Sequence, residues 1–247
     1  MEKLKAVEIC KSFQGNMAVD HASLTVEEGK ITGLIGANGA GKTTLFNCIS
    51  GYYAATSGKI YYKGEEIQHH SSQKLCRMGI ARTFQIAKPF GMLSALDNVA
   101  VGGYNRGTSR KEAYKIASQC LETVGLSSKA DSLAMLLNTG EQRRLELARA
   151  LATRPELLML DEVMAGLTPT ESREMIKLIK KINESGITIL MIEHIMPVIM
   201  QLSHRVYVME RGKMIAEGTP EEVANDPRVI ESYIGKNGGG DVNAEDN

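Results

Sequence analysis

The chain has 247 residues, and its 29 Lys and Arg balance its 29 Asp and Glu, so the net charge is zero. A balanced charge gives no global attraction to nucleic acid, and we expect no nucleic-acid partner, although the composition leaves a local basic patch open. Hydrophobic residues make up 43% of the chain, which suffices for one large domain or for a core with an inserted lobe.

The N-terminal residues, the apolar stretches and the cysteines indicate the cellular compartment that we expect for the chain. Residues 1–5 have no apolar run behind them of the kind that a secretory signal requires. The longest apolar stretches, such as residues 187–192, reach about a third of the ~20 residues that a membrane helix needs, so we expect no membrane span. The cysteines at 10, 48, 76 and 120 form no C-x-x-C pair, which predicts reduced cytosolic thiols and disfavours a zinc site.

Residues 4–30 predict β-strands, because apolar side chains alternate there, as at Val7, Ile9 and Phe13. Phe13 lies at the end of the first strand. An aromatic ring at that place, ahead of a phosphate-binding loop, can stack on an adenine ring. A core position for Phe13 remains an equal alternative.

Residues 36–44, GANGAGKTT, follow an apolar run and lead into a helical stretch, and they contain the pattern G-x-x-x-x-G-K-[ST]. Glycines let successive N–H groups form an anion-binding concavity, and the start of the helix adds its positive end. Lys42 would neutralise β- and γ-phosphate oxygens, and the Thr43 hydroxyl would bind Mg²⁺. The loop therefore predicts binding of a nucleoside triphosphate through Gly36, Asn38, Gly39, Gly41, Lys42, Thr43 and Thr44.

Further along, residues 58–62 and 79–85 predict short strands, the second ending at Gln85. Residues 86–153 change to helical periodicity, as expected of a helical lobe inserted into an α/β core. Residues 137–142 then open a helix that we predict over 143–153. The short glycine-containing start of this helix is a candidate second anion-binding site, and a solvated face is the alternative.

Two apolar runs carry polar residues at their carboxyl ends. Residues 157–160 end at Asp161 and Glu162, which predicts a buried parallel strand delivering two carboxylates to the sheet edge where α/β proteins bind ligands. Asp161 suits Mg²⁺ coordination and Glu162 suits polarising an attacking water. Residues 187–192 end at Glu193 and His194, and the histidine is placed to donate to a γ-phosphate oxygen, with a structural role as the alternative.

The last part of the chain predicts smaller elements. Residues 168–171 form a capping box with proline at the first helical position. A hairpin is expected about Arg211 and Gly212, followed by two short helices near 221–224 and 229–233. The glycine-rich residues 236–247 are expected to be a flexible tail.

In this order the motifs resemble the nucleotide-binding subunit of ATP-binding-cassette (ABC) transporters over about residues 4–235. The resemblance is nearest to the ATPases of bacterial importers for branched-chain amino acids. It matches the phosphate loop to Walker A, Gln85 to the Q-loop, 138–142 to the signature motif, 157–162 to Walker B, 165–168 to the D-loop and His194 to the switch histidine.

The resemblance implies an α/β P-loop NTPase (RecA-like) core over 1–86 and 154–235, with an N-terminal antiparallel β-subdomain and an inserted helical subdomain over about 87–153. It implies hydrolysis of ATP with Mg²⁺ at the cytoplasmic face of the cell membrane, beside permease subunits that dock near residues 86–97. It also implies a head-to-tail dimer of two copies, or of this chain with a sibling ATPase. The roles it assigns are catalysis by Glu162, His194 and Gln85, Mg²⁺ binding by Thr43, Gln85 and Asp161, and contact with the partner's ATP by Asn138, Gly140 and Gln142.

The sequence departs from the family pattern at four positions. Asn138 and Thr139 replace the usual Ser-Gly of the signature; Asn138 keeps a donor, and Thr139 must be extended or helical because a positive φ is costly for it. Val163 replaces a proline, and Thr168 stands where the D-loop usually ends in Asp or Asn. We expect the changes at Val163 and Thr168 at most to slow hydrolysis or to weaken coupling across the dimer. The alternatives are a soluble ABC-type assembly or regulatory factor and a non-hydrolysing ATP-dependent dimerisation module.

Overall fold

The computed structural model describes residues 1–84 and 89–234. Its larger β-sheet has six strands in the order β10-β9-β3-β8-β7-β6, all parallel to their neighbours except β10. These strands are β3 (Ile31–Ile35), β6 (Ile80–Arg82), β7 (Leu157–Asp161), β8 (Thr188–Ile192), β9 (Arg205–Glu210) and β10 (Lys213–Gly218). Helix α6 (Pro169–Glu184) connects β7 to β8, and α7 (Met196–Leu202) connects β8 to β9.

A second, antiparallel sheet has the order β2-β1-β4-β5. Its strands are β1 (Glu2–Phe13), β2 (Asn16–Glu27), β4 (Ser57–Tyr62) and β5 (Glu65–Glu66). The first two form a hairpin in which Phe13 lies opposite Asn16, which confirms the strands predicted from the alternation in residues 4–30.

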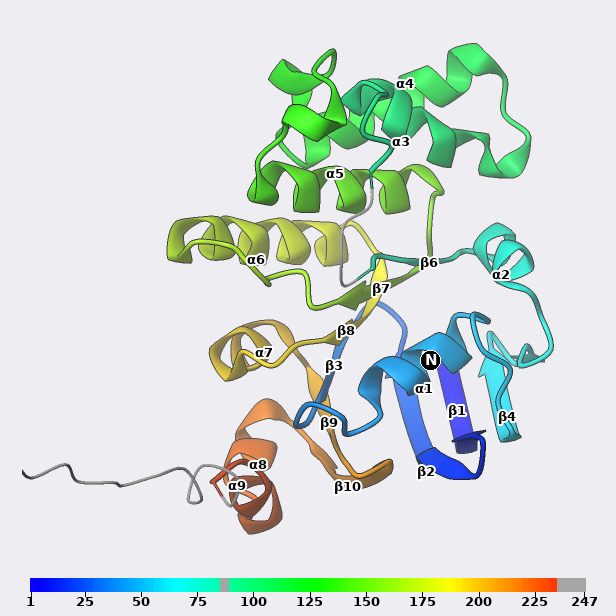
Figure 1. The fold of residues 1–247 in the computed structure, drawn as a ribbon, viewed down its shortest axis with the longest axis vertical. Coiled ribbons are helices and arrows are strands. Elements are labelled where there is room, and N and C mark those ends of the chain that lie inside the picture. Colours follow the sequence, from blue (N-terminus) through cyan, green and yellow to red (C-terminus); the bar gives the residue numbers. More distant parts are fainter. Residues whose placement is uncertain (85–88, 235–247) are drawn as a thin grey trace, which may run out of the picture.

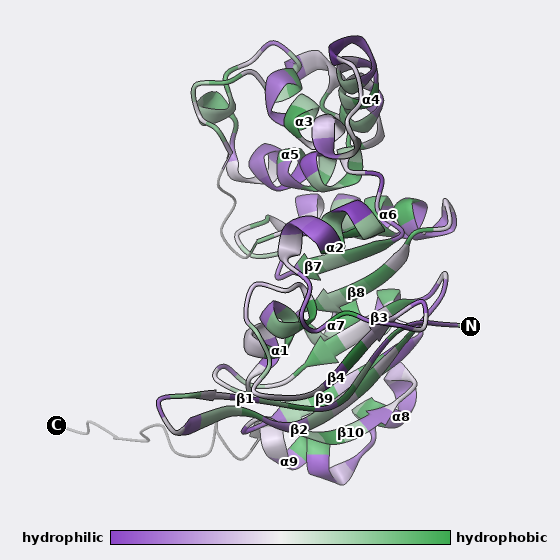
Figure 2. Cartoon of the chain, turned by 90° about the vertical axis from the view of Figure 1, so that its right-hand side faces the viewer, coloured by the Kyte–Doolittle hydropathy of each residue, from purple (hydrophilic) through white to green (hydrophobic). Residues whose placement is uncertain are grey.

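The central strands are buried on both faces, as expected of a parallel sheet between two layers. On β7, Leu158 and Leu160 belong to the core that includes α6, whereas Leu157 and Met159 belong to the core beneath the antiparallel sheet. Helix α1 (Lys42–Ile49) contributes Leu45, Phe46 and Ile49 to that second core. Figure 1 shows α1 between the two sheets, and Figure 2 shows β7 and β8 largely in the green of hydrophobic residues.

Three helices gather at one end of the molecule, beyond α6 (Figure 1). They are α3 (Ala95–Gly103), α4 (Arg110–Thr123) and α5 (Thr139–Ala152). The helical character predicted for residues 86–153 is thus confirmed where the structure describes them, while a separate subdomain with bounds near 87 and 153 stays a prediction. The other helices are α2 (Ser72–Met78), η1 (Tyr104–Arg106), η2 (Ser127–Lys129), η3 (Ala134–Leu136), α8 (Pro220–Ala224) and α9 (Pro227–Ile234).

Helix α5 begins at Thr139, so the predicted start at residue 143 is wrong. The reason is a capping box: the Asn138 Oδ1 accepts from the Glu141 N–H at 2.9 Å, and the Glu141 carboxylate accepts from the Asn138 N–H at 3.0 Å. Thr139 is therefore helical, which is one of the two conformations expected of it because a positive φ would be costly. The box predicted at residues 168–171 is confirmed at the start of α6.

The arrangement of a parallel sheet with flanking helices, an antiparallel β-layer and a helical group confirms the predicted α/β fold class. In the part of the chain that the structure describes, every helix is too short or too polar to cross a bilayer. Gln85 and the predicted tail at 236–247 lie outside the described residues.

Candidate functional site

The phosphate loop joins β3 to α1 in a conformation that only glycine tolerates at key positions. Gly36, Gly39 and Gly41 have φ values of +148°, +78° and +101°. A Cβ on Gly36 would lie 2.1 Å from the Met209 carbonyl oxygen, and one on Gly41 would lie 2.4 Å from the Ala18 carbonyl oxygen. The loop is therefore fixed both by its backbone conformation and by close contact with neighbouring strands.

Lys42, the first residue of α1, is held inside this loop. It is only 5% exposed, and its Nζ donates to the carbonyl oxygens of Gly36 at 2.8 Å and Ala37 at 3.0 Å. Gly41 caps α1 without a side-chain hydrogen bond, and the first turn contains no acidic residue. The N–H groups that begin this helix are thus available to an anion, beside a fixed positive charge.

A cavity of about 340 Å³ opens at the loop. It brings Glu162 together with most of the residues predicted to bind the nucleotide. Its lining consists of Ala18, Asn38, Gly39, Ala40, Gly41, Lys42, Thr43, Thr44 and Glu162. A hydroxyl, a carboxylate and an ammonium group therefore meet around one concave, glycine-rich surface, which suits a phosphate chain.

Asp161 ends β7 and is 1% exposed. Its Oδ2 lies 3.5 Å from the Arg82 Nη2, whereas its buried Oδ1 has no hydrogen-bond partner among the described residues. Burial raises the pKa of Asp161, and the Arg82 charge opposes that change. An unpartnered carboxylate oxygen and the Thr43 hydroxyl are ligands of the kind that Mg²⁺ prefers, so these residues fit the ion.

Glu162 and His194 follow neighbouring strands. Asp161 pairs with Ile192 in the parallel register of β7 and β8, so the residues after both strands emerge at the same sheet edge. Glu162 is half-buried and has a φ of +48°, an uncommon left-handed conformation for a non-glycine residue. His194 is exposed. The structure thus places at one edge the two side chains that the sequence placed there.

Phe13 is 40% exposed and packs edge-to-face against Tyr53 with ring centroids 5.3 Å apart. The Lys11 Nζ lies 5.0 Å from the Phe13 centroid. The ring stands outside the lining of the phosphate cavity. It is therefore a surface aromatic on the hairpin β1–β2, and the core alternative left open by the sequence is wrong.

The residues matched to the signature do not line the phosphate cavity. Asn138 and Gly140 line a separate hollow of about 210 Å³ that also includes Glu171. A Cβ on Gly140 would lie 2.4 Å from the Glu171 Oε1, so a side chain at this position would require the Glu171 carboxylate to move. Gln142 turns its Nε2 onto the Leu137 carbonyl oxygen at 2.9 Å. Within one chain, the two groups of predicted nucleotide ligands are therefore apart.

Two charged residues at this site, the half-buried Arg82 and the buried Glu193, went unpredicted. The Arg82 Nη1 donates to the Asn47 Oδ1 at 2.6 Å and to the Ser50 Oγ at 3.0 Å, so Arg82 connects the end of α1 to Asp161. Glu193 is fully buried beside the predicted histidine. Its position at the end of a buried strand, next to His194, was the signal that could have revealed it.

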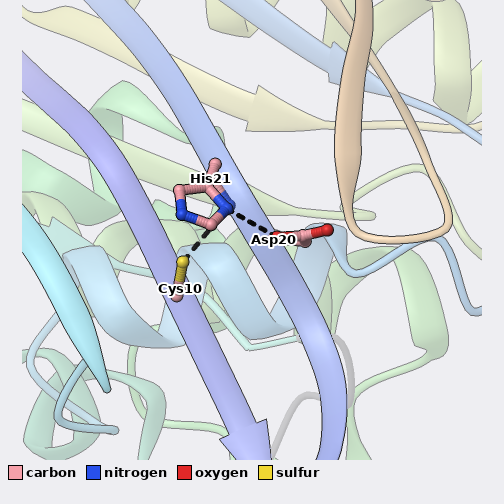
Figure 3. A group of neighbouring side chains, drawn as sticks. All are labelled: Cys10, Asp20 and His21. Carbon is pink, nitrogen blue, oxygen red and sulfur yellow. Dashed lines mark hydrogen bonds and ion pairs between the residues drawn. The ribbon is translucent and has the colours of Figure 1, made fainter.

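Cys10, Asp20 and His21 are candidate metal ligands on β1 and β2, with ligand atoms within 4.8 Å of one another (Figure 3). Hydrogen bonds explain the cluster. The His21 Nδ1 lies 2.6 Å from the Asp20 Oδ1, and the backbone N–H of His21 donates to the Cys10 Sγ at 3.4 Å. Lys213 also pairs with Asp20 at 3.2 Å. Because an ammonium group already neutralises this carboxylate, we assign no metal to the cluster.

Comparisons with known proteins identify the family. The ABC transporter family profile matches residues 19–165, and a profile for branched-chain amino acid ATP-binding cassette transporters matches residues 213–238. The chain is 40% identical to the high-affinity branched-chain amino acid transport ATP-binding protein LivG of Salmonella typhimurium, and equally to BraF of Pseudomonas aeruginosa. Each alignment covers 91% of this chain and 94% of the relative.

Solved structures give the same result. A nucleotide-free ATP-binding cassette from an ABC transporter superposes with a TM-score of 0.87 at 32% identity, covering 94% of this chain and 99% of that one. A dimeric cassette in a post-hydrolysis state, bound to ADP and phosphate, superposes with a TM-score of 0.80 at 25% identity, covering 88% and 98%.

Proposed function

Since this chain is an ATPase of the ABC transporter family, we propose that it energises uptake of branched-chain amino acids through a separate membrane permease. The observation that carries the substrate class is the match of residues 213–238 to the branched-chain profile, together with relatives named for that transport. These relatives favour an importer subunit over a soluble assembly factor. A bound permease would hold the chain at the cytoplasmic face of the membrane.

Uptake by the native host tests this proposal. Deleting the gene should abolish high-affinity uptake of labelled leucine, isoleucine and valine while leaving uptake of arginine unchanged. Wild-type protein should restore uptake, and Glu162→Gln should not. Unchanged leucine uptake in the deletion strain, with loss of another solute, would show that the substrate class is wrong.

The proposed chemistry divides among residues of the site. The loop N–H groups and Lys42 hold the phosphates. Mg²⁺ at Thr43 and Asp161 would neutralise phosphate oxygens, with Gln85 as a third proposed ligand. Glu162 accepts a proton as a water oxygen bonds to the γ-phosphorus, and the bond from that phosphorus to the β,γ-bridging oxygen breaks, giving ADP and phosphate. His194 donates a hydrogen bond to a γ-phosphate oxygen.

A head-to-tail dimer is supported by the separation of the phosphate cavity from the hollow at Asn138 and Gly140. In such a dimer the partner's signature residues would complete each ATP site, so ATP binding would be linked to closure of the pair. Light scattering on Glu162→Gln tests this. Doubling of the mass with ATP supports a homodimer, whereas a monomer that still binds ATP points to a sibling ATPase.

For the permease we propose a docking groove of about 340 Å³ between the end of α1, β6, α3 and α5. Exposed Tyr52, Phe84 and Val101 give it apolar walls, and Arg149 adds a cation. The Arg149 guanidinium also lies 4.9 Å from the ring centroid of Phe90, within the segment predicted to dock the permease. These contacts suit an amphipathic helix with an acidic residue.

Copurification tests the docking groove. Val101→Glu should reduce the amount of permease recovered with the ATPase by about 10-fold, because it buries a charge in the apolar wall. Ile230→Glu, a matched change of an exposed apolar residue on α9, should retain the permease. Equal recovery with both variants would place the permease elsewhere.

A further inference from the structure

Glu193 links two loops of the site. The side chain is 0% exposed, and its Oε1 accepts from the Met164 N–H at 3.1 Å. His194 is the next residue in the chain. Met164 lies two residues after Glu162, and His194 follows β8. One buried side chain thus connects the loop of the predicted base to the loop of the predicted switch histidine.

The loop that Glu193 contacts holds Glu162 in a costly conformation. A non-glycine residue at a φ of +48° is disfavoured by about 1–2 kcal/mol and persists only where its surroundings fix it. On its strand side, the Glu162 N–H donates to the Ile192 carbonyl oxygen at 3.0 Å. On its far side, the turn is closed by the Ala165 N–H donating to the Glu162 backbone carbonyl oxygen at 3.2 Å, and Glu193 accepts from the N–H of Met164 within that turn.

The Glu193 carboxyl group can accept hydrogen bonds while it carries less than a full negative charge. Burial, with the charge of Glu162 adding to it, raises the pKa of Glu193 to about 7, although the Met164 N–H opposes the change. The second oxygen, Oε2, is buried and has no hydrogen-bond partner among the described residues. A well-packed apolar side chain would avoid this cost, but it could not accept from the Met164 N–H.

We propose that Glu193 is a positioning residue for ATP hydrolysis, which fixes Glu162 and His194 relative to each other through its hydrogen bond to the Met164 N–H and its place next to His194 in the chain. The inference rests on the proposed roles of Glu162 and His194. Because the base must lie within hydrogen-bond reach of the attacking water, a small shift of its loop should lower kcat without changing how ATP is held.

The test compares three substitutions in the full-length chain. Glu193→Gln keeps an acceptor oxygen at the same reach and should retain kcat within about 3-fold. Glu193→Leu removes the acceptor, and Glu193→Asp keeps a charge but shortens the side chain by one methylene. Both should lower kcat about 10- to 100-fold with KM within about 2-fold. If the Glu193→Leu variant does not fold, Glu193→Asp still tests the positioning role.

A second measurement does not depend on turnover. Hydrogen–deuterium exchange of peptides covering residues 162–166 should be faster in Glu193→Leu and Glu193→Asp than in the wild type, and unchanged in Glu193→Gln. Thr188→Val is the matched control, because Thr188 is fully buried on β8, the strand that Glu193 follows, and its Oγ1 accepts from the Gly29 N–H at 2.9 Å, away from the site. It should change neither exchange at 162–166 nor kcat.

The outcomes separate the inference from the proposed function. Wild-type kcat and exchange in Glu193→Leu and Glu193→Asp would overturn the positioning role, as would an equal loss of kcat in Thr188→Val. Equal losses in Glu193→Gln and Glu193→Leu would show that an acceptor is not what the site requires, which also overturns it. Full turnover in Glu162→Gln would instead refute the proposed base, on which the inference rests.

Discussion

The phosphate loop and the carboxylate edge, by which we mean Asp161, Glu162 and Glu193, are built in different ways. In the loop, the cation Lys42 is held by carbonyl oxygens from its own segment, at 2.8 and 3.0 Å. At the edge, Asp161 and Glu193 come from neighbouring strands, are buried, and each keeps one oxygen without a hydrogen-bond partner among the described residues.

This difference indicates that nucleotide binding depends on the phosphate loop and hydrolysis on the carboxylate edge. The loop draws its N–H groups and its cation from one contiguous segment, and it offers them to an anionic ligand. The edge depends on the sheet, and burial raises the pKa of both Asp161 and Glu193. We therefore expect substitutions in the loop to change nucleotide affinity and substitutions at the edge to change turnover or its dependence on pH.

The largest expected effect is at the edge. Glu162→Gln should lower kcat about 100- to 10,000-fold, because a carboxamide cannot accept the proton of the attacking water. Its ATP affinity, measured by calorimetry, should stay within about 2-fold of the wild type. Loss of affinity together with kcat would contradict the division between loop and edge.

The next effect concerns pH and Glu193. The pKa of this carboxyl is about 7 in the folded protein against an ordinary 4.5, so the native state binds one more proton than the unfolded state between these values. Its contribution to the free energy of unfolding is complete below pH 4.5 and lost as pH rises to 7, a fall of about 3 kcal/mol. The free energy of unfolding, measured with urea at pH 5 and pH 7, should fall less between these two pH values in Glu193→Gln than in the wild type. Identical falls in both proteins would argue against a raised pKa.

In the loop, Lys42→Ala should weaken ATP binding about 10- to 100-fold, the loss expected for charged hydrogen bonds worth about 1.5–3 kcal/mol. Isothermal titration calorimetry measures this effect. Lys59→Ala is the matched control, because Lys59 is an exposed lysine paired with Glu66 on the antiparallel sheet. Wild-type affinity in Lys42→Ala would show that the loop N–H groups suffice.

The smallest expected effect tests whether stacking of Phe13 on the adenine ring contributes to ATP affinity. Phe13→Ala should weaken ATP binding about 3- to 10-fold, since an aromatic stacking contact contributes about 0.5–1.5 kcal/mol. GTP affinity relative to ATP affinity gives a second readout of base stacking. Tyr53→Leu, which removes the edge-to-face neighbour of Phe13, should have a weaker effect. No change in Phe13→Ala would leave the phosphates as the main source of affinity.

The elements predicted from the sequence depended on local signals, and most were found in the structure. The strand before the phosphate loop, the capping box at residues 168–171 and the hairpin about Arg211 and Gly212 follow from patterns within a few residues. The start of α5 was missed, because the cap formed by Asn138 and Glu141 was attributed to an anion-binding turn rather than to a helix already begun.

By itself, the sequence determined the phosphate loop, because its glycines, lysine and threonine are contiguous in the chain. It also placed Asp161, Glu162 and His194 at the ends of buried strands. Only the tertiary structure decided what surrounds them: Arg82 beside Asp161, and Glu193 between two loops that lie about 30 residues apart in the chain. The physical reason is that parallel strands bring distant segments to one sheet edge, and burial there changes the chemistry of each carboxyl group.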